Sequence, residues 1–182
     1  RVMAGKIVLT RERLNLADAV QRSVAVIVGT GQLQDHQTDV QLEPVWVNAD
    51  PARLSQVIEN LLINAIKYTP ARGLIRIQTR VEGDEAILRV QDSGMGIAPE
   101  LLPRVFELFT QGQRSLDRAQ GGLGIGLTLV RRLVELHGGR VAAYSEGPSK
   151  GSAFVVCLPR AEARRTNHVL PAAVAPSSVS RK

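Results

Sequence analysis

The chain has 182 residues, of which 44% are hydrophobic and 22% charged, and these ordinary proportions exclude a wholly disordered or fibrous protein. The net charge of +6 suggests nucleic-acid binding. However, five of the 23 basic residues and one of the 17 acidic residues lie in 160–182, so the rest of the chain has 18 basic and 16 acidic residues. A basic tail on a nearly neutral body with only 3% aromatic residues is a weak signal for nucleic acid, and we expect none as a partner.

The first third of the chain predicts short strands around one helix. A strand is expected at 6–10, followed by a helix at 15–29 whose apolar residues follow a helical stripe. Two further strands are expected at 40–42 and 45–47, separated by Pro44.

Asp50 and Pro51 predict the start of a longer helix, because a capping carboxylate followed by proline suits the first turn. The apolar residues that follow recur every three or four positions and are Leu54, Val57, Ile58, Leu61, Leu62, Ala65 and Ile66. This spacing predicts one amphipathic helix that ends near Pro70.

The alternating segment 74–81 and its neighbour 86–90 predict a hairpin with a turn at Gly83 and Asp84. A glycine-punctuated segment then runs from 92 to 126.

This segment contains a short helix at 99–105. A second amphipathic helix is expected at 127–136, and a last pair of strands at 141–144 and 153–158. After Pro159 the composition changes to Ala, Pro, Ser and Arg, which predicts a linker or tail.

Cys157 is the only cysteine, which excludes an intrachain disulfide and favours a buried thiol in a reducing compartment. No apolar run approaches the 18 residues of a membrane span, so a cytoplasmic domain is expected. Because the sequence starts at Arg1 without methionine, we expect a fragment of a longer protein.

Asn60, Asn64 and Lys67 recur at helical spacing beside the apolar stripe of the 50–69 helix. Amide oxygens can ligate Mg²⁺ and an ammonium can meet phosphate, so this stripe suits a polyphosphate with a hard cation. Taken alone, this stripe is more typical of a solvated polar face.

Asp92 follows a predicted strand directly, and Gly94 and Gly96 come after it. The glycines allow the backbone to approach a planar ligand, and the carboxylate can accept a hydrogen bond from an amine such as adenine N6. An ordinary turn containing an aspartate is the alternative.

Gly122, Gly124 and Gly126 open the 127–136 helix, which directs free backbone N–H groups at an anion. The pattern lacks the Gly-Lys-Ser/Thr of a Walker loop and could also be a flexible hinge. The polar segment 110–120 before it carries Arg114 and suits a mobile lid over phosphates.

Together these segments resemble, in order and spacing, the N, G1, F, G2 and G3 boxes of sensor histidine kinases. The segments are 60–69 (NLLINAIKYT), 92–97 (DSGMGI), 104–109 (RVFELF), 122–127 (GLGIGL) and 147–152 (GPSKGS). Five boxes in register are far more specific than any one of them. The chain is thus similar to the catalytic ATP-binding domain of a two-component histidine kinase, within the GHKL (gyrase, Hsp90, histidine kinase, MutL) ATPases.

The resemblance implies a Bergerat-type ATP-binding fold. This is an α/β (α+β) two-layer sandwich with a mixed, mostly antiparallel sheet and helices on one face. The nucleotide would lie between helices and a flexible lid. The domain would cover 1–159, and 160–182 would be a basic tail or linker.

The resemblance also implies residue roles. Asn64 would be the main Mg²⁺ ligand with Asn60 beside it, Lys67 would contact phosphate, Tyr68 would pack near adenine, and Asp92 would accept from adenine N6. The remaining implied contacts are Gly94, Gly96 and Ile97 in the adenine pocket, Gly122, Gly124, Gly126 and Leu127 at the phosphates, and Ser152 on the adenine side. No box fixes Arg114, which we expect to reach the γ-phosphate from the lid.

Related ATPases of the gyrase and Hsp90 type place a glutamate where this chain has Asn60. An amide cannot act as a base, so ATP binding with phosphoryl transfer is favoured over rapid hydrolysis. Glu59 is adjacent but about 100 degrees around the helix. We expect it to face solvent or to support the site indirectly.

The family's acceptor histidine is absent, because His36, His137 and His168 lie outside any His-Glu or His-Asp helical motif. His137 is expected at a helix end, where a cation suits the dipole. The acceptor would belong to a separate dimerisation domain of the same parent kinase, which could be membrane-anchored. A response regulator would act downstream. The isolated fragment is expected to be monomeric. The alternatives are an anti-sigma-factor-type serine kinase and a non-catalytic nucleotide-binding module.

Overall fold

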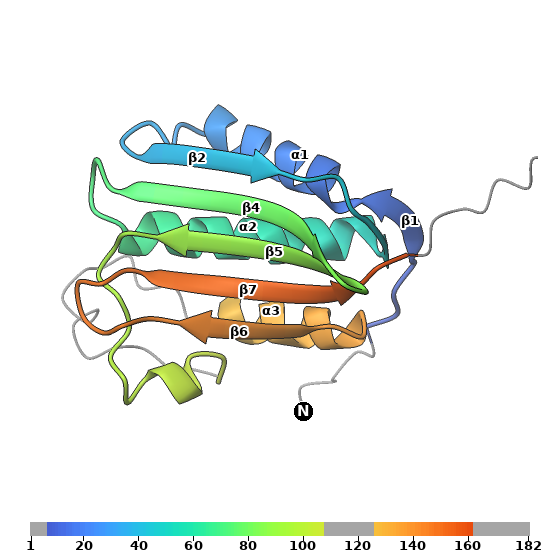
Figure 1. Ribbon diagram of the computed structural model, residues 1–182. Coiled ribbons are helices and arrows are strands. Elements are labelled where there is room, and N and C mark those ends of the chain that lie inside the picture. Colours follow the sequence, from blue (N-terminus) through green and yellow to red (C-terminus); the bar gives the residue numbers. More distant parts are fainter. Residues whose placement is uncertain (1–6, 108–125, 162–182) are drawn as a thin grey trace, which may run out of the picture.

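The computed structural model describes residues 7–107 and 126–161, which form two layers (Figure 1). One layer is a five-stranded sheet in the order β2-β4-β5-β7-β6. Its strands are β2 (Gln37–Leu42), β4 (Leu74–Glu82), β5 (Glu85–Asp92), β7 (Ser152–Pro159) and β6 (Arg140–Tyr144). β2 is parallel to β4, and the other neighbours in this sheet are antiparallel.

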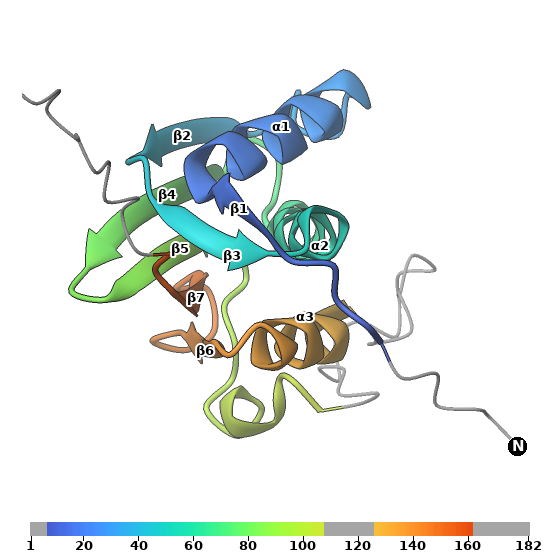
Figure 2. The ribbon, with the colours of Figure 1, turned by 90° about the vertical axis from the view of Figure 1, so that its right-hand side faces the viewer.

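The other layer consists of helices on one face of the sheet (Figure 2). They are α1 (Leu16–Gly29), α2 (Pro51–Tyr68) and α3 (Gly126–Leu136). A two-stranded ribbon of β1 (Glu12–Asn15) and β3 (Trp46–Ala49) lies apart from the sheet, and the 3-10 helix η1 (Leu102–Arg104) follows β5. The predicted two-layer sandwich with a mixed, mostly antiparallel sheet is therefore confirmed. Within the described ranges, no helix combines the length and apolar content that a membrane span needs.

The hydrophobic core lies between the two layers. Alternate side chains of β5 and β7 face the helices, and the apolar stripe of α2 meets them. The buried members include Leu88, Val90, Phe154, Val156, Leu54, Ile58, Leu61 and Leu62. Burial of each large aliphatic side chain contributes about 1.5–3 kcal/mol, so this seam holds α2 firmly on the sheet.

Helix α2 begins and ends almost where the sequence predicts. The carboxylate of Asp50 accepts a hydrogen bond from the N–H of Arg53 at 3.1 Å, and Pro51 occupies the first turn. The helix ends at Tyr68, two residues before Pro70. Its polar stripe is thereby carried on a rigid, well-capped element.

The strand predicted at 6–10 was wrong. Residues 7–10 are not a strand, and the first strand is β1, which pairs with β3. The N–H of Thr10 instead donates to the carboxylate of Asp50 at 2.9 Å. The short helix predicted at 99–105 is also shorter, a single 3-10 turn.

Candidate functional site

Helix α2 presents Asn60, Asn64 and Lys67 beside its buried stripe. Asn60 and Asn64 are partly buried, and Lys67 is exposed with its Nζ 5.2 Å from the centre of the Tyr68 ring. The interpretation as a polar stripe at the edge of the core is consistent with this burial pattern.

The amide of Asn60 has a fixed orientation. Its Nδ2 donates to the carbonyl of Gln56 at 2.7 Å, which identifies Oδ1 as the acceptor end of the amide. A Cβ atom at Gly126 would lie 2.9 Å from this Oδ1, so the amide oxygen occupies the space that a side chain at the first residue of α3 would need. The structure thus brings an N-box residue and the end of the G2 box into contact.

The turn at 92–97 packs directly against the end of α2. The N–H of Met95 donates to the carbonyl of Tyr68 at 3.0 Å, and a Cβ at Gly94 would come within 2.1 Å of that same oxygen. Only glycine permits this approach.

Asp92 is 5% exposed and joins two of the boxes. Its Oδ1 accepts from the N–H of Gly94 at 2.8 Å, and its Oδ2 accepts from the hydroxyl of Ser152 at 2.5 Å. Each carboxylate oxygen can accept more than one hydrogen bond, so the group retains acceptor capacity for a ligand amine.

A second serine, Ser145, also belongs to this site and was missed in the sequence. Its hydroxyl accepts from the N–H of Ile97 at 2.9 Å and donates to the carbonyl of Gly151 at 2.7 Å. Gly96 has a φ of 69°, and a Cβ there would lie 2.1 Å from the carbonyl of Gly147. The position of Ser145, two residues before the first glycine of the G3 box, was the sequence signal that could have identified it.

The F box is anchored to the sheet through Phe106. Its ring lies edge-to-face on Phe154 of β7, with centres 6.1 Å apart and an interplanar angle of 86°. Leu127 at the start of α3 also packs against the core. The structure therefore brings together the described parts of the N, G1, G2 and G3 boxes and packs the F box on β7, whereas Arg114, Gly122 and Gly124 lie outside the described residues.

The chain belongs to the histidine kinase-, DNA gyrase B- and HSP90-like ATPase family, whose model matches residues 49–162. It is 43% identical over 111 residues to the circadian input-output histidine kinase CikA of Synechococcus elongatus, which is 61% of this chain and 15% of that protein. It is 33% identical over 172 residues to the sensor protein GacS of Pseudomonas syringae pv. syringae, which is 90% of this chain and 19% of that protein. The chain thus spans less than a fifth of the length of either relative.

Two solved structures show the same fold. A mycobacterial sensor histidine kinase, MprB, superposes with a TM-score of 0.72 at 27% identity, covering 83% of this chain and 98% of that one. Full-length ShkA in complex with AMPPNP superposes with a TM-score of 0.73 at 26% identity, covering 88% of this chain and 33% of that one. Together with the family match, these likenesses define an ATP-binding domain of the sensor histidine kinase type.

Proposed function

We propose that this domain binds Mg-ATP between α2 and the turn at 92–97 and donates the γ-phosphoryl group to a histidine of a separate dimerisation domain. The observation that carries the proposal is Asp92, a buried carboxylate held by Gly94 and Ser152 at the foot of the N-box helix. Such a group recognises an amine edge, and adenine offers one at N6. The ShkA structure was solved with AMPPNP, which supports a nucleotide in the equivalent place.

The donor set fits a triphosphate with a hard cation. The bond from Asn60 Nδ2 to Gln56 orients the amide so that Oδ1 is its acceptor end, and amide oxygens are ligands that Mg²⁺ accepts. The described ranges contain no trio of His, Cys, Asp or Glu able to hold a metal. We therefore assign Mg²⁺ to Asn64 and Asn60 together with the phosphate oxygens, and the cation would neutralise the charge on those oxygens.

The remaining roles follow from position. Lys67 lies exposed one turn beyond Asn64 and would contact phosphate as a point charge. Backbone amides at the start of α3, with Gly122 and Gly124, would face the phosphates, and Arg114 would meet the γ-phosphate. Because Asn60 cannot take a proton from water, we expect slow hydrolysis and transfer to an acceptor instead.

A nucleotide titration tests the binding step. In the full chain, Asp92→Asn should weaken Mg-ATP binding by about tenfold or more, since hydrogen bonds to a charged group contribute about 1.5–3 kcal/mol. Guanine carries a carbonyl where adenine carries the amine, so the unchanged chain should prefer Mg-ATP to Mg-GTP and Asp92→Asn should lose that preference. Asp84→Asn, in the exposed β4–β5 turn, is the matched control and should bind like the unchanged chain. Equal affinity of all three chains for both nucleotides would contradict the assignment of Asp92 to adenine recognition.

A transfer assay separates the histidine kinase from its alternatives. Radiolabelled ATP, the chain and a dimerisation domain from a sensor kinase should give an acid-labile, base-stable phosphoprotein, as expected of phosphohistidine. An acid-stable product would favour a serine kinase of the anti-sigma-factor type. Tight Mg-ATP binding without transfer to any acceptor would favour a non-catalytic nucleotide-binding module.

The assignment also implies a setting. We place the domain in the cytoplasm, as the ATP-binding end of a longer two-component kinase whose phosphorylated histidine passes the group to a response regulator. Monomeric behaviour of the isolated chain is part of the proposal, because dimerisation would belong to the separate acceptor domain. Sedimentation of the purified chain tests this directly, and a stable dimer would contradict it.

A further inference from the structure

His137 follows the last residue of α3 and is only 4% exposed. Its Nε2 lies 3.0 Å from the backbone nitrogen of Asp50, and its Nδ1 lies 2.7 Å from the carbonyl oxygen of Leu133. A backbone N–H only donates and a carbonyl only accepts, so Nδ1 carries the proton and Nε2 carries none. Both ring nitrogens are therefore used in hydrogen bonds that fit the neutral Nδ1–H form of the ring.

The hydrogen bond to Asp50 joins the end of α3 to the start of α2. The same two helices come close again where the start of α3 lies beside the middle of α2, because a Cβ at Gly126 would lie 2.9 Å from the amide oxygen of Asn60. Between these contacts α2 advances ten residues and α3 eleven, about 15 Å and about 16.5 Å at the rise of an α-helix. Figure 2 shows the two helices side by side, and because the two lengths match, one register of α3 on α2 satisfies both contacts.

The contacts between these two joints are apolar. Val130, Leu133 and Val134 of α3 are buried in the core that α2 also enters. Apolar contact is non-directional and by itself permits small axial displacements, whereas a hydrogen bond of 3.0 Å between buried groups does not. His137 is thus the directional contact that sets how far along α2 the helix α3 sits.

We infer that His137, in its neutral Nδ1–H form, is a positioning residue that holds α3 in register on α2 and so places Gly126 and Leu127 opposite Asn60 at the phosphate end of the site. The inference rests on the proposed function. Two other contacts hold the same region together: Thr10 bonds to the Asp50 carboxylate, and Arg11 Nη2 bonds to the Leu136 carbonyl at 2.5 Å. Variants at position 137 should therefore still fold.

The tautomer can be read without any nucleotide. In the ¹⁵N-labelled full chain at neutral pH, NMR should show one imidazole with a protonated Nδ1 and an unprotonated Nε2. This signal should vanish in His137→Gln, which assigns it. An Nε2–H tautomer or an imidazolium at this position would overturn the inference.

The positioning role is tested by a pair of substitutions. The side-chain carbonyl of glutamine can accept from the Asp50 N–H much as Nε2 does, whereas leucine cannot. His137→Leu should weaken Mg-ATP binding about tenfold, and His137→Gln should stay within about threefold of the unchanged chain. Val20→Ala, which empties space at a buried position of α1, is the control for general destabilisation and should keep the Mg-ATP affinity while lowering the melting temperature.

The possible failures are distinct. If His137→Leu binds Mg-ATP as well as the unchanged chain, the positioning role is overturned and the proposed function stands. The same holds if Val20→Ala weakens Mg-ATP binding as much as His137→Leu does. If the unchanged chain binds no Mg-ATP, the proposed function fails and the positioning role fails with it, while the NMR result still reports the joint between the helices.

Discussion

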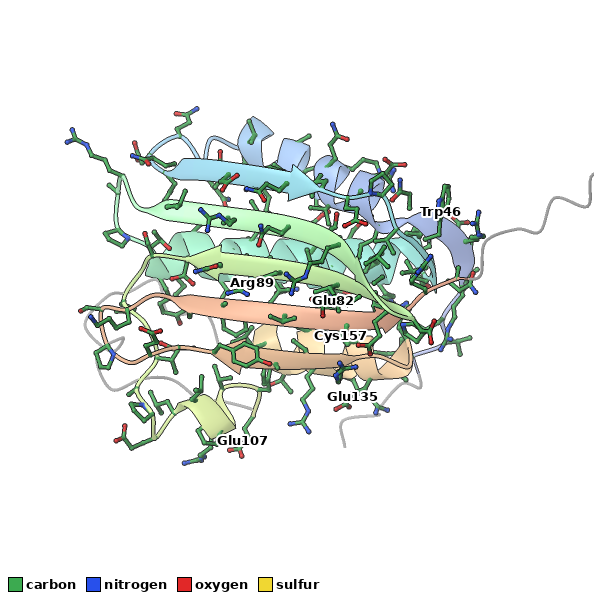
Figure 3. All side chains as sticks on the ribbon, in the orientation of Figure 1. Trp46, Glu82, Arg89, Glu107, Glu135 and Cys157 are labelled. Carbon is green, nitrogen blue, oxygen red and sulfur yellow. The ribbon has the colours of Figure 1, made fainter. Side chains whose placement is uncertain are left out.

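Cys157 lies on the face of the sheet opposite the helices (Figure 3), beside Arg140 of the neighbouring strand, and is only 8% exposed. Burial raises the pKa of its thiol, and the nearby Arg140 guanidinium only partly opposes this. Because the thiolate is the reactive form, we predict that iodoacetamide alkylates the native chain much more slowly than the chain in denaturant. Mass spectrometry of timed samples measures both rates. Equal rates would show that the thiol is accessible in the folded protein.

The placement of the candidate site residues was predictable where a single helix carries them. Asn60, Asn64 and Lys67 share a stripe because helical spacing alone puts them there. The bond between Asp92 and Ser152 was not predictable in the same way, since the two residues are 60 positions apart and meet only because β5 pairs with β7 in the observed register. Ser145 was missed for the same reason: its partner Ile97 belongs to another segment.

The turn at 92–97 depends on a glycine with no room for a side chain. A Cβ at Gly94 would come within 2.1 Å of the Tyr68 carbonyl oxygen, a backbone atom at the end of a helix that cannot move independently. Gly94→Ala should therefore lower the free energy of unfolding by about 1–3 kcal/mol and weaken Mg-ATP binding as the turn leaves α2. Urea unfolding and nucleotide titration measure the two effects.

Gly29→Ala is the control for this prediction. Gly29 is the last residue of α1, and a Cβ there would meet no atom within 4 Å. Alanine in a helix is favoured over glycine by about 0.5–1 kcal/mol, so this variant should be neutral or slightly more stable. Similar losses in both variants would mean that packing against Tyr68 does not matter.

The start of α2 gives the fold a defined pH dependence. The backbone N–H groups of Thr10 and Arg53 donate to the Asp50 carboxylate and lower its pKa below the ordinary value. A carboxyl group with a lowered folded-state pKa stabilises the fold above its unfolded pKa of about 3.9, and this contribution disappears as the pH falls through the folded value.

Asp50→Asn keeps an oxygen for capping but cannot titrate. We predict that the unchanged chain exceeds this variant in unfolding free energy at pH 7, and that the difference shrinks towards pH 3. Urea unfolding at the two pH values measures it, and the other acidic groups cancel in the comparison. A difference that does not change with pH would contradict the role of the carboxylate charge.

Whole elements were predictable when their signal was local. α2 has a cap, a proline and a long apolar repeat, and its observed bounds differ from the predicted ones by a single residue at each end. β1 has one buried residue, Leu14, in the sequence Glu-Arg-Leu-Asn, and it is a strand only because β3 lies beside it. The apolar residues at 7–9 misled the prediction, because none of the strands in 7–107 and 126–161 pairs with them.

At the scale of the whole molecule, the sheet order could not be derived from periodicity. β6 and β7 follow the other strands in the chain, yet β7 pairs with β5 in the middle of the sheet and β6 takes its edge. This crossover brings the G3 turn beside the turn at 92–97. The resemblance to a known family, and not the hydrophobic pattern, was what predicted the sandwich.

The end of the domain can be tested by truncation. The boundary between 159 and 160 stays a prediction, but Arg160 forms a bridge to Val47, its N–H donates to the Asp84 carbonyl at 2.9 Å, and the N–H of Ala161 donates to the Trp46 carbonyl at 2.8 Å. Each such bond contributes about 0.5–1.5 kcal/mol net. A chain that ends at 161 should match the full chain in unfolding free energy and Mg-ATP affinity, whereas one that ends at 159 should be about 1–3 kcal/mol less stable. Equal stability of the two truncated chains in urea would place the end of the folded unit at 159 and make the contacts with β3 dispensable.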